Sequence, residues 1–135
     1  MFNSKALLTA FAAVLASIAA ATPVGPVTEV PVTVTVCTGG VGVGCAAIPI
    51  VSETCVNLTG GLSFLNKQIS TAIIPAGFVC QFFQRFNCNA SPVKGSTDSE
   101  IVLTAGTWNF FNVPGLSGRS TNFNDLTSSF TCSPI

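Results

Sequence analysis

Hydrophobic and polar residues alternate along the segment VPVTVTVC (residues 30–37), which has valine at every second position and threonine on the opposite face. A period of two with β-branched residues is typical of a half-buried β-strand. The glycine-rich TGGVGVG that follows (38–44) leads into neither a helix nor a Walker-type Lys-Ser/Thr pair. It therefore predicts a tight hairpin and not a phosphate-binding loop.

Helix signals are weak along the rest of the chain. A short helical turn fits within Phe64–Ile74, where Pro75, Gly77 and the β-branched residues limit its length. The pattern thus favours an all-β domain with a core between two sheets. Large apolar side chains available for that core are Phe78, Phe82, Phe83, Phe86, Trp108, Phe110 and Phe111.

The N-terminal segment has the features of a secretory signal peptide. Met1–Lys5 carries one positive charge, and Ala6–Ala21 is an apolar run that ends in small residues. Cleavage before Thr22 is predicted, which leaves 22–31 as an extended leader or edge segment and 32–135 as the domain. A membrane anchor is the alternative, but the run is short and has no basic stop-transfer flank. We expect a secreted, extracellular protein without a membrane span in its mature form.

Charged residues are too few for several classes of function. After residue 21 the chain has four basic and five acidic residues and no histidine. A net charge of about −1 without a basic stripe argues against nucleic-acid binding. The lack of histidine rules out Ser-His-Asp and Cys-His catalysis, and no carboxylate pair stands out as a glycosidase site. We therefore expect a protein that is not an enzyme.

Six cysteines follow the predicted signal peptide, an even number that predicts three disulfides in a small exported chain. A zinc site is disfavoured because the chain has no Cys-x2-Cys pair. Two glycosylation sequons, at Asn57 and Asn89, suit a eukaryotic secretory route, although Pro92 makes use of the second less favourable. The cysteines are Cys37, Cys45, Cys55, Cys80, Cys88 and Cys132.

An internal repeat organises the domain. The spacing Cys-x7-Cys occurs at 37/45 and at 80/88, and the similar segments LNKQIST (65–71) and FNDLTSS (123–129) follow the two copies. The second copy is longer by a polar insertion, 89–100. The repeat predicts two halves, about 32–76 and 77–132. It favours Cys37–Cys45 and Cys80–Cys88 as equivalent disulfides with Cys55–Cys132 as the third, while pairing between repeats, such as Cys37–Cys80, stays open.

The segment Asn124-Asp125-Leu126-Thr127-Ser128-Ser129, with its N-terminal twin, resembles the corner motif of the βγ-crystallin superfamily. The VxVCTG opening, the Cys-x-Phe-Phe hairpin and the closing FNDxxSSFxC are similar to those of small secreted fungal proteins with one such domain. The resemblance covers about Val30–Cys132. It implies two Greek-key motifs packed as a β-sandwich and stabilised by disulfides.

The resemblance also implies a calcium site at this corner. Calcium takes about six to eight oxygen ligands, from carboxylates, carbonyls, hydroxyls and water. Carried over, the family pattern nominates Asp125, the Leu126 carbonyl and Ser128, with Asn124 as a further ligand or a corner-shaping residue. In the N-terminal copy Asn66 and Ser70 match.

That N-terminal copy departs from the pattern at Lys67, whose ammonium would repel a cation, and at Thr71. At most one weak calcium site is therefore expected. The alternative is an ion-free corner, in which polar side chains bond to the backbone.

Two functions remain open at the level of the sequence. The first is a secreted, non-catalytic structural or binding protein, expected to be a monomer. The second is a secreted effector or an antimicrobial, killer-toxin-like protein that acts on another cell. A near-neutral chain suits membrane attack poorly. A hydrophobin is disfavoured because the chain has no adjacent Cys-Cys pairs.

Overall fold

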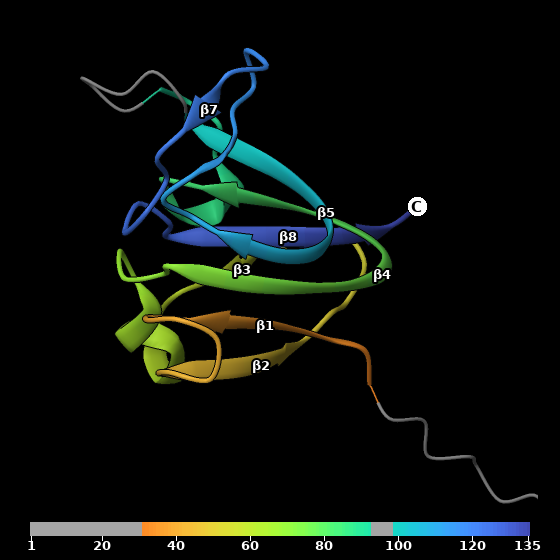
Figure 1. The fold of residues 1–135 in the computed structure, drawn as a ribbon. Coiled ribbons are helices and arrows are strands. Elements are labelled where there is room, and N and C mark those ends of the chain that lie inside the picture. The colour runs from red at the N-terminus through yellow and green to blue at the C-terminus, as the bar shows by residue number, and fades with distance from the viewer. Residues whose placement is uncertain (1–30, 93–98) are drawn as a thin grey trace, which may run out of the picture. The chain divides into compact units, whose positions relative to one another are not determined.

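A computed structural model describes residues 31–92 and 99–135, which belong to one compact unit, Pro31–Ile135. The predicted signal peptide and nearly all of the leader lie outside the described residues. Within them the chain forms antiparallel strands and two short 3-10 turns (Figure 1). The elements are β1 (Thr33–Cys37), β2 (Cys45–Pro49), β3 (Val56–Asn57), η1 (Gly60–Leu65), β4 (Thr71–Phe83), η2 (Phe86–Cys88), β5 (Glu100–Asn109), β6 (Val113–Pro114), β7 (Ser120–Thr121) and β8 (Ser129–Pro134).

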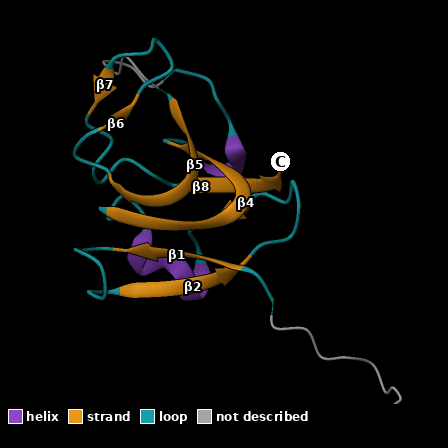
Figure 2. Ribbon diagram, turned by 45° about the vertical axis from the view of Figure 1, so that its right-hand side comes forward, coloured by secondary structure: helices purple, strands orange, loops and turns teal. Residues whose placement is uncertain are grey.

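The long strand β4 connects the two halves of the domain. The main sheet has the order β2-β1-β4-β8-β3, with β5 paired along β4, and β6 and β7 form a separate pair. The first part of β4 pairs with β1 and its second part with β8, and the register with β5 shifts between Ile74 and Val79. Gly77, with φ of 84°, supplies the left-handed backbone at this bend. The curled sheet confirms the all-β prediction (Figure 2), and the predicted boundary between the halves falls inside β4.

The first hairpin follows the alternation of the sequence. In β1, Val34 and Val36 are fully buried while Thr33 and Thr35 are half-buried. The glycine-rich loop joins β1 to β2 as an antiparallel hairpin, as predicted. Gly44 has φ of 63°, and a Cβ atom there would lie 2.0 Å from the Thr38 hydroxyl. A larger residue would therefore be strained and would clash with Thr38.

An aromatic cluster forms the centre of the core. The Phe82 ring meets Phe110 edge-on at 5.0 Å and stacks on Phe130 at 5.4 Å, and Phe110 lies 6.4 Å from Phe123. All four side chains are fully or almost fully buried. Such pairs stabilise a core beyond the burial of apolar area alone.

The prediction of core aromatics was right for Phe82, Phe83 and Phe110, and wrong for two others. Phe86 is 41% exposed and Phe111 is 56% exposed. Phe86 lies in η2, after β4 has ended, and Phe111 follows the end of β5. Neither side chain therefore belongs to the inward face of a strand. The predicted helical turn is also displaced, because the helical residues are Gly60–Leu65 and β4 begins at Thr71.

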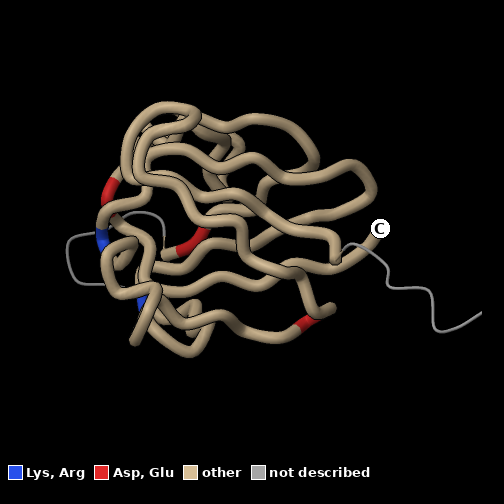
Figure 3. The backbone as a smooth tube through the Cα atoms, turned by 90° about the horizontal axis from the view of Figure 1, so that it is seen from below, with Lys and Arg blue, Asp and Glu red and all other residues tan. Residues whose placement is uncertain are grey.

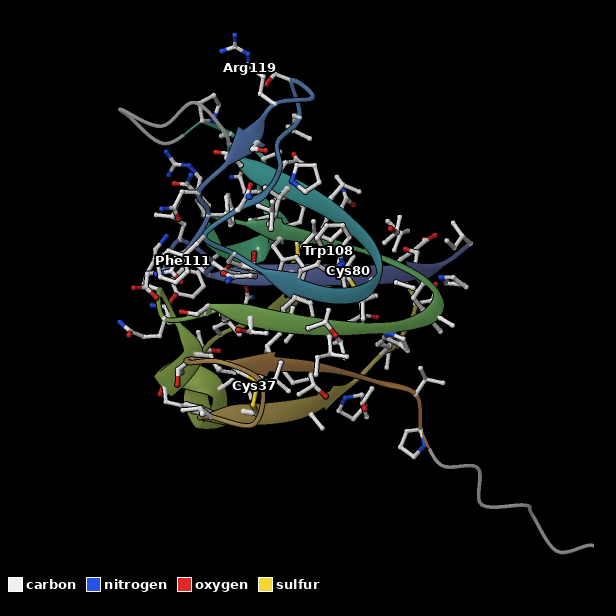
Figure 4. The ribbon with its side chains drawn as sticks, in the orientation of Figure 1. Cys37, Cys80, Trp108, Phe111 and Arg119 are labelled. Carbon is white, nitrogen blue, oxygen red and sulfur yellow. A yellow bond between two sulfur atoms is a disulfide. The ribbon has the colours of Figure 1, made fainter. Side chains whose placement is uncertain are left out.

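Three disulfides join Cys37 to Cys45, Cys55 to Cys88 and Cys80 to Cys132. The predicted Cys37–Cys45 bond is confirmed; Cys80–Cys88 and Cys55–Cys132 are wrong, and Cys37 does not pair with Cys80. Strand register explains two of the bonds. Cys37 lies opposite Cys45 on β1 and β2, and Cys80 lies opposite Cys132 on β4 and β8 (Figure 4).

The error in pairing has a structural cause. The Ser70 amide donates to the Cys37 carbonyl, whereas its counterpart Ser128 donates to the Phe83 carbonyl. In the two halves Cys37 therefore corresponds to Phe83 and not to Cys80. The repeated Cys-x7-Cys spacing is a coincidence of sequence, three residues out of register with the structural repeat.

Candidate functional site

The two corner segments, Asn66–Thr71 and Asn124–Ser129, lie against each other as a near-symmetric pair. The Lys67 amide donates to the Thr127 carbonyl at 2.8 Å, and the Asp125 amide donates to the Ile69 carbonyl at 3.1 Å. Lys67 and Asp125 also share a left-handed backbone, with φ of 58° and 60°. A pseudo-twofold relation therefore connects Lys67 with Asp125.

The same relation extends through the end of each corner segment. The Ser70 carbonyl accepts from the Phe110 amide at 2.9 Å, and the Ser128 carbonyl accepts from the Leu58 amide at 3.0 Å. The Thr71 hydroxyl donates to the Gly39 carbonyl at 2.7 Å. These contacts tie each corner to both halves of the domain, which is the role expected of an ion-free corner.

Ser129, the counterpart of Thr71, makes two such contacts. Its hydroxyl donates to the Arg85 carbonyl at 2.6 Å and accepts from the Cys88 amide at 2.9 Å. The side chain is fully buried. Because buried polar groups are costly when unpaired, Ser129 holds the turn η2 firmly against β8.

The two halves differ most at Lys67. Its ammonium donates to the Leu126 carbonyl at 2.9 Å and also to the Gln84 carbonyl. Lys67 as a whole is exposed, but the contact of its ammonium with Gln84 is partly buried. This burial, and secondarily the positive charge of Arg85, lowers the pKa of Lys67 from its usual value. A cationic group of the chain itself thus lies against a carbonyl that the sequence nominates as a calcium ligand.

The pseudo-twofold relation bears on how the nominated ligands would group. Lys67 contacts the Leu126 carbonyl of the C-terminal corner. Under the pseudo-twofold relation, Asp125 is the counterpart of Lys67 and faces the N-terminal corner. There Gln68 takes the place of Leu126, and Ser70 takes that of Ser128. Asp125 itself is exposed. By this symmetry we expect the Asp125 carboxylate on the side of Gln68 and Ser70, whereas the sequence analysis groups it with the Leu126 carbonyl.

Orphaned oxygens occur at both corners. The Oδ1 atoms of Asn66 and Asn124 and the hydroxyl of Thr127 are buried without a hydrogen-bond partner. Such oxygens fit the ligand preference of calcium. Among the described residues no group of three or more His, Cys, Asp or Glu is placed to hold a metal ion. A cation at either corner would rely on carbonyl, amide and hydroxyl oxygens with one carboxylate at most.

The two glycosylation candidates differ in their surroundings. The Asn57 amide is occupied: it donates to Asn87 Oδ1 at 3.0 Å and accepts from the Asn87 backbone amide at 2.7 Å. Asn89 is exposed, and its Oδ1 accepts from the Ser91 amide at 2.8 Å. The nitrogen that would carry a glycan is therefore more accessible at Asn89 than at Asn57.

A cavity of about 450 Å³ opens beside the Lys67 corner and was not anticipated from the sequence. It brings together residues from one corner segment, from the end of β4 and from η2. The one feature that could have predicted this cavity is that Lys67 and Arg85 lie side by side. These two residues are distant in the sequence, so their proximity was not visible there. The residues that line it are Lys67, Gln84, Arg85, Phe86, Asn89 and Ser128.

Comparison with known proteins identifies the fold. No family model matches the sequence, and no curated protein matches it significantly. A solved structure described under "Evolution of the eye lens beta-gamma-crystallin domain fold" matches with a TM-score of 0.54 at 15% identity, over 79% of this chain and 90% of that one. A mutant βγ-crystallin domain from Clostridium beijerinckii gives 0.49 at 13% identity, over 75% and 97%. The N-terminal domain of Protein S gives 0.49 at 17% identity, over 76% and 97%.

The chain therefore has the βγ-crystallin fold, as its corner motif indicated. Within the described residues, no helix has the length and apolar character needed to cross a membrane.

Proposed function

We propose that this protein is a secreted, non-catalytic binding or structural protein. Its fold is that of βγ-crystallin domains, and its three disulfides are compatible with an extracellular environment. Small exported domains commonly depend on such bonds, because a short chain buries a limited core. The disulfides support the proposal by making unfolding, and hence proteolysis, less favourable.

Calcium binding in this protein is weak and restricted to one ion. The observation that carries this proposal is the ammonium of Lys67 at 2.9 Å from the Leu126 carbonyl. At the Leu126 carbonyl the Lys67 ammonium supplies the positive charge that a metal ion would otherwise supply, together with hydrogen bonds. It therefore repels a calcium ion from this corner. The ion is instead held at the opposite corner by the Asp125 carboxylate, with the Gln68 carbonyl and Ser70 as its partners. A single carboxylate gives low affinity.

The test is the thermal unfolding of the oxidised protein in EDTA and in millimolar calcium. A ligand that binds only the native state at about 100 times its Kd adds near 2.7 kcal/mol of stability. We expect a clear upward shift in Tm for the wild type and none for Asp125→Asn. Asparagine removes the charge but tolerates the left-handed backbone at this position.

The matched control is Glu53→Gln, because Glu53 is also an exposed acidic residue with a positive φ. This variant should keep the full calcium shift. A calcium shift retained by Asp125→Asn would refute the assignment of the site, and no shift in the wild type would leave both corners ion-free.

The second candidate is an effector or toxin that acts on another cell. Because the protein is nearly neutral, charge would not attract it to such a target. Figure 3 shows how few charged residues the described chain carries. Growth inhibition or a host-cell response to micromolar purified protein, lost on reduction of the disulfides, would favour this candidate over the first.

A further inference from the structure

The cavity beside the Lys67 corner, here called the basic pocket, is lined by Lys67, Gln84, Arg85, Phe86, Asn89 and Ser128. Two of these residues carry a positive charge, and none of the six is acidic. Within the part of the chain that the structure describes, Lys67 and Arg85 form hydrogen bonds to carbonyl oxygens only. The pocket therefore concentrates positive charge that no carboxylate among its lining residues offsets.

Backbone contacts hold both cationic groups in place. The Lys67 ammonium is fixed by the carbonyls of Gln84 and Leu126. The Arg85 guanidinium donates through Nε to the Ser91 carbonyl at 3.1 Å and through Nη2 to the Pro92 carbonyl at 3.0 Å. A ligand would therefore find these charges already positioned, at a lower entropic cost than for two free side chains.

Donor groups remain available in the pocket after these contacts. An ammonium has one more N–H than its two carbonyl partners use, and a guanidinium has several more. The Ser128 hydroxyl makes no hydrogen bond to another described residue, and the Asn89 Oδ1 contact leaves its amide nitrogen free to donate. Phe86, 41% exposed, adds an apolar wall.

We propose that the basic pocket binds a small phosphate or sulfate monoester. A tetrahedral oxyanion presents oxygens in several directions and carries up to two negative charges, which suits a pocket lined by two cations and two neutral donors. The volume of about 450 Å³ exceeds what a bare anion needs, and leaves room for the esterified group against Phe86.

The two cationic groups of the pocket are close enough for the positive charge of Arg85 to act on Lys67. A bound dianion would offset this repulsion. The basic pocket lies beside the corner from which Lys67 excludes calcium. It is therefore independent of the calcium site proposed at Asp125.

The test uses the whole chain with its disulfides intact, made in a bacterial host that adds no N-linked glycan at Asn89. Inorganic sulfate and methyl phosphate are titrated by calorimetry in EDTA at constant ionic strength set with chloride. Both should bind with saturation, and acetate should bind at least tenfold more weakly. Arg85→Gln should weaken sulfate binding at least tenfold. Arg119→Gln makes the same charge change between β6 and β7 (Figure 4), at a residue that does not line the pocket, and should stay within twofold.

A second measurement needs no variant, because Arg85 also supports the chain at Ser91 and Pro92 and its replacement can disturb folding. Backbone amide chemical shifts of the labelled protein are followed by NMR during a sulfate titration. Saturable shift changes at Lys67, Arg85 and Ser128 support the proposal. No saturable change at these residues, equal binding of acetate, or equal losses in Arg85→Gln and Arg119→Gln would each overturn it.

Discussion

Replacing Ser129 with alanine tests how much of the domain's stability depends on the C-terminal corner. The fully buried hydroxyl joins Arg85 and Cys88 to β8 through two hydrogen bonds, of 2.6 and 2.9 Å. Ser129→Ala leaves the Arg85 carbonyl and the Cys88 amide, both in partly buried contacts, without their partner. At about 1–2 kcal/mol for each lost bond, the free energy of unfolding should fall by about 2–4 kcal/mol.

The pseudo-twofold mate provides a matched control. Thr71 makes one such bond, from its hydroxyl to Gly39 at 2.7 Å, and it is also buried. Thr71→Val keeps the shape of the side chain and should cost about 1 kcal/mol, roughly half or less of the effect of Ser129→Ala.

Thermal and denaturant unfolding of the two oxidised variants measure this difference. For a domain of about 100 residues, 1 kcal/mol corresponds to about 4–5 °C in Tm. The expected decreases are therefore about 8–20 °C for Ser129→Ala and about 4–5 °C for Thr71→Val. Equal decreases, or a change below about 0.5 kcal/mol for Ser129→Ala, would refute the view that this hydroxyl anchors η2.

Two further predictions concern the disulfides and Lys67. Removing Cys80–Cys132, with a sequence separation of 52, should lower the free energy of unfolding by about 4 kcal/mol on the chain-entropy estimate. Removing Cys37–Cys45, with a separation of 8, should lower it by about 2.5 kcal/mol. Chemical denaturation of the two double alanine variants checks this order, and the reverse order would contradict it. The lowered pKa of Lys67 means that the unfolded chain holds this proton more tightly than the folded one. Stability should therefore rise with pH from that lowered pKa up to the unfolded value near 10.5, and this rise should be absent in Lys67→Met.

The sequence predicts the fold because its signals are local. Alternation places Val34 and Val36 inward, and the glycines of the first loop permit a hairpin. The corner motif indicates the βγ-crystallin fold, since its spacing reflects hydrogen bonds within one turn and to the strand beside it. Phe86 and Phe111 were misassigned because composition does not show where a strand ends.

The disulfides and the basic pocket depend instead on strand register and on distant contacts. Cys80 pairs with Cys132 because β4 and β8 place them opposite each other, and the coincidental Cys-x7-Cys repeat concealed this. Lys67 was recognised as unfavourable for calcium, but its contact with Leu126, 59 residues away, required the folded chain. The neighbouring charge of Arg85 is likewise a product of tertiary structure.

The central claim is that Lys67 takes the place of a cation at one corner and leaves only the Asp125 corner for calcium. Calorimetric stoichiometry tests it most directly, in the wild type, in Asp125→Asn and in Lys67→Asp, which gives each corner an aspartate. The account predicts one calcium ion for the wild type, none for Asp125→Asn and two for Lys67→Asp. Two ions in the wild type, or no additional ion in a folded Lys67→Asp variant, would contradict it.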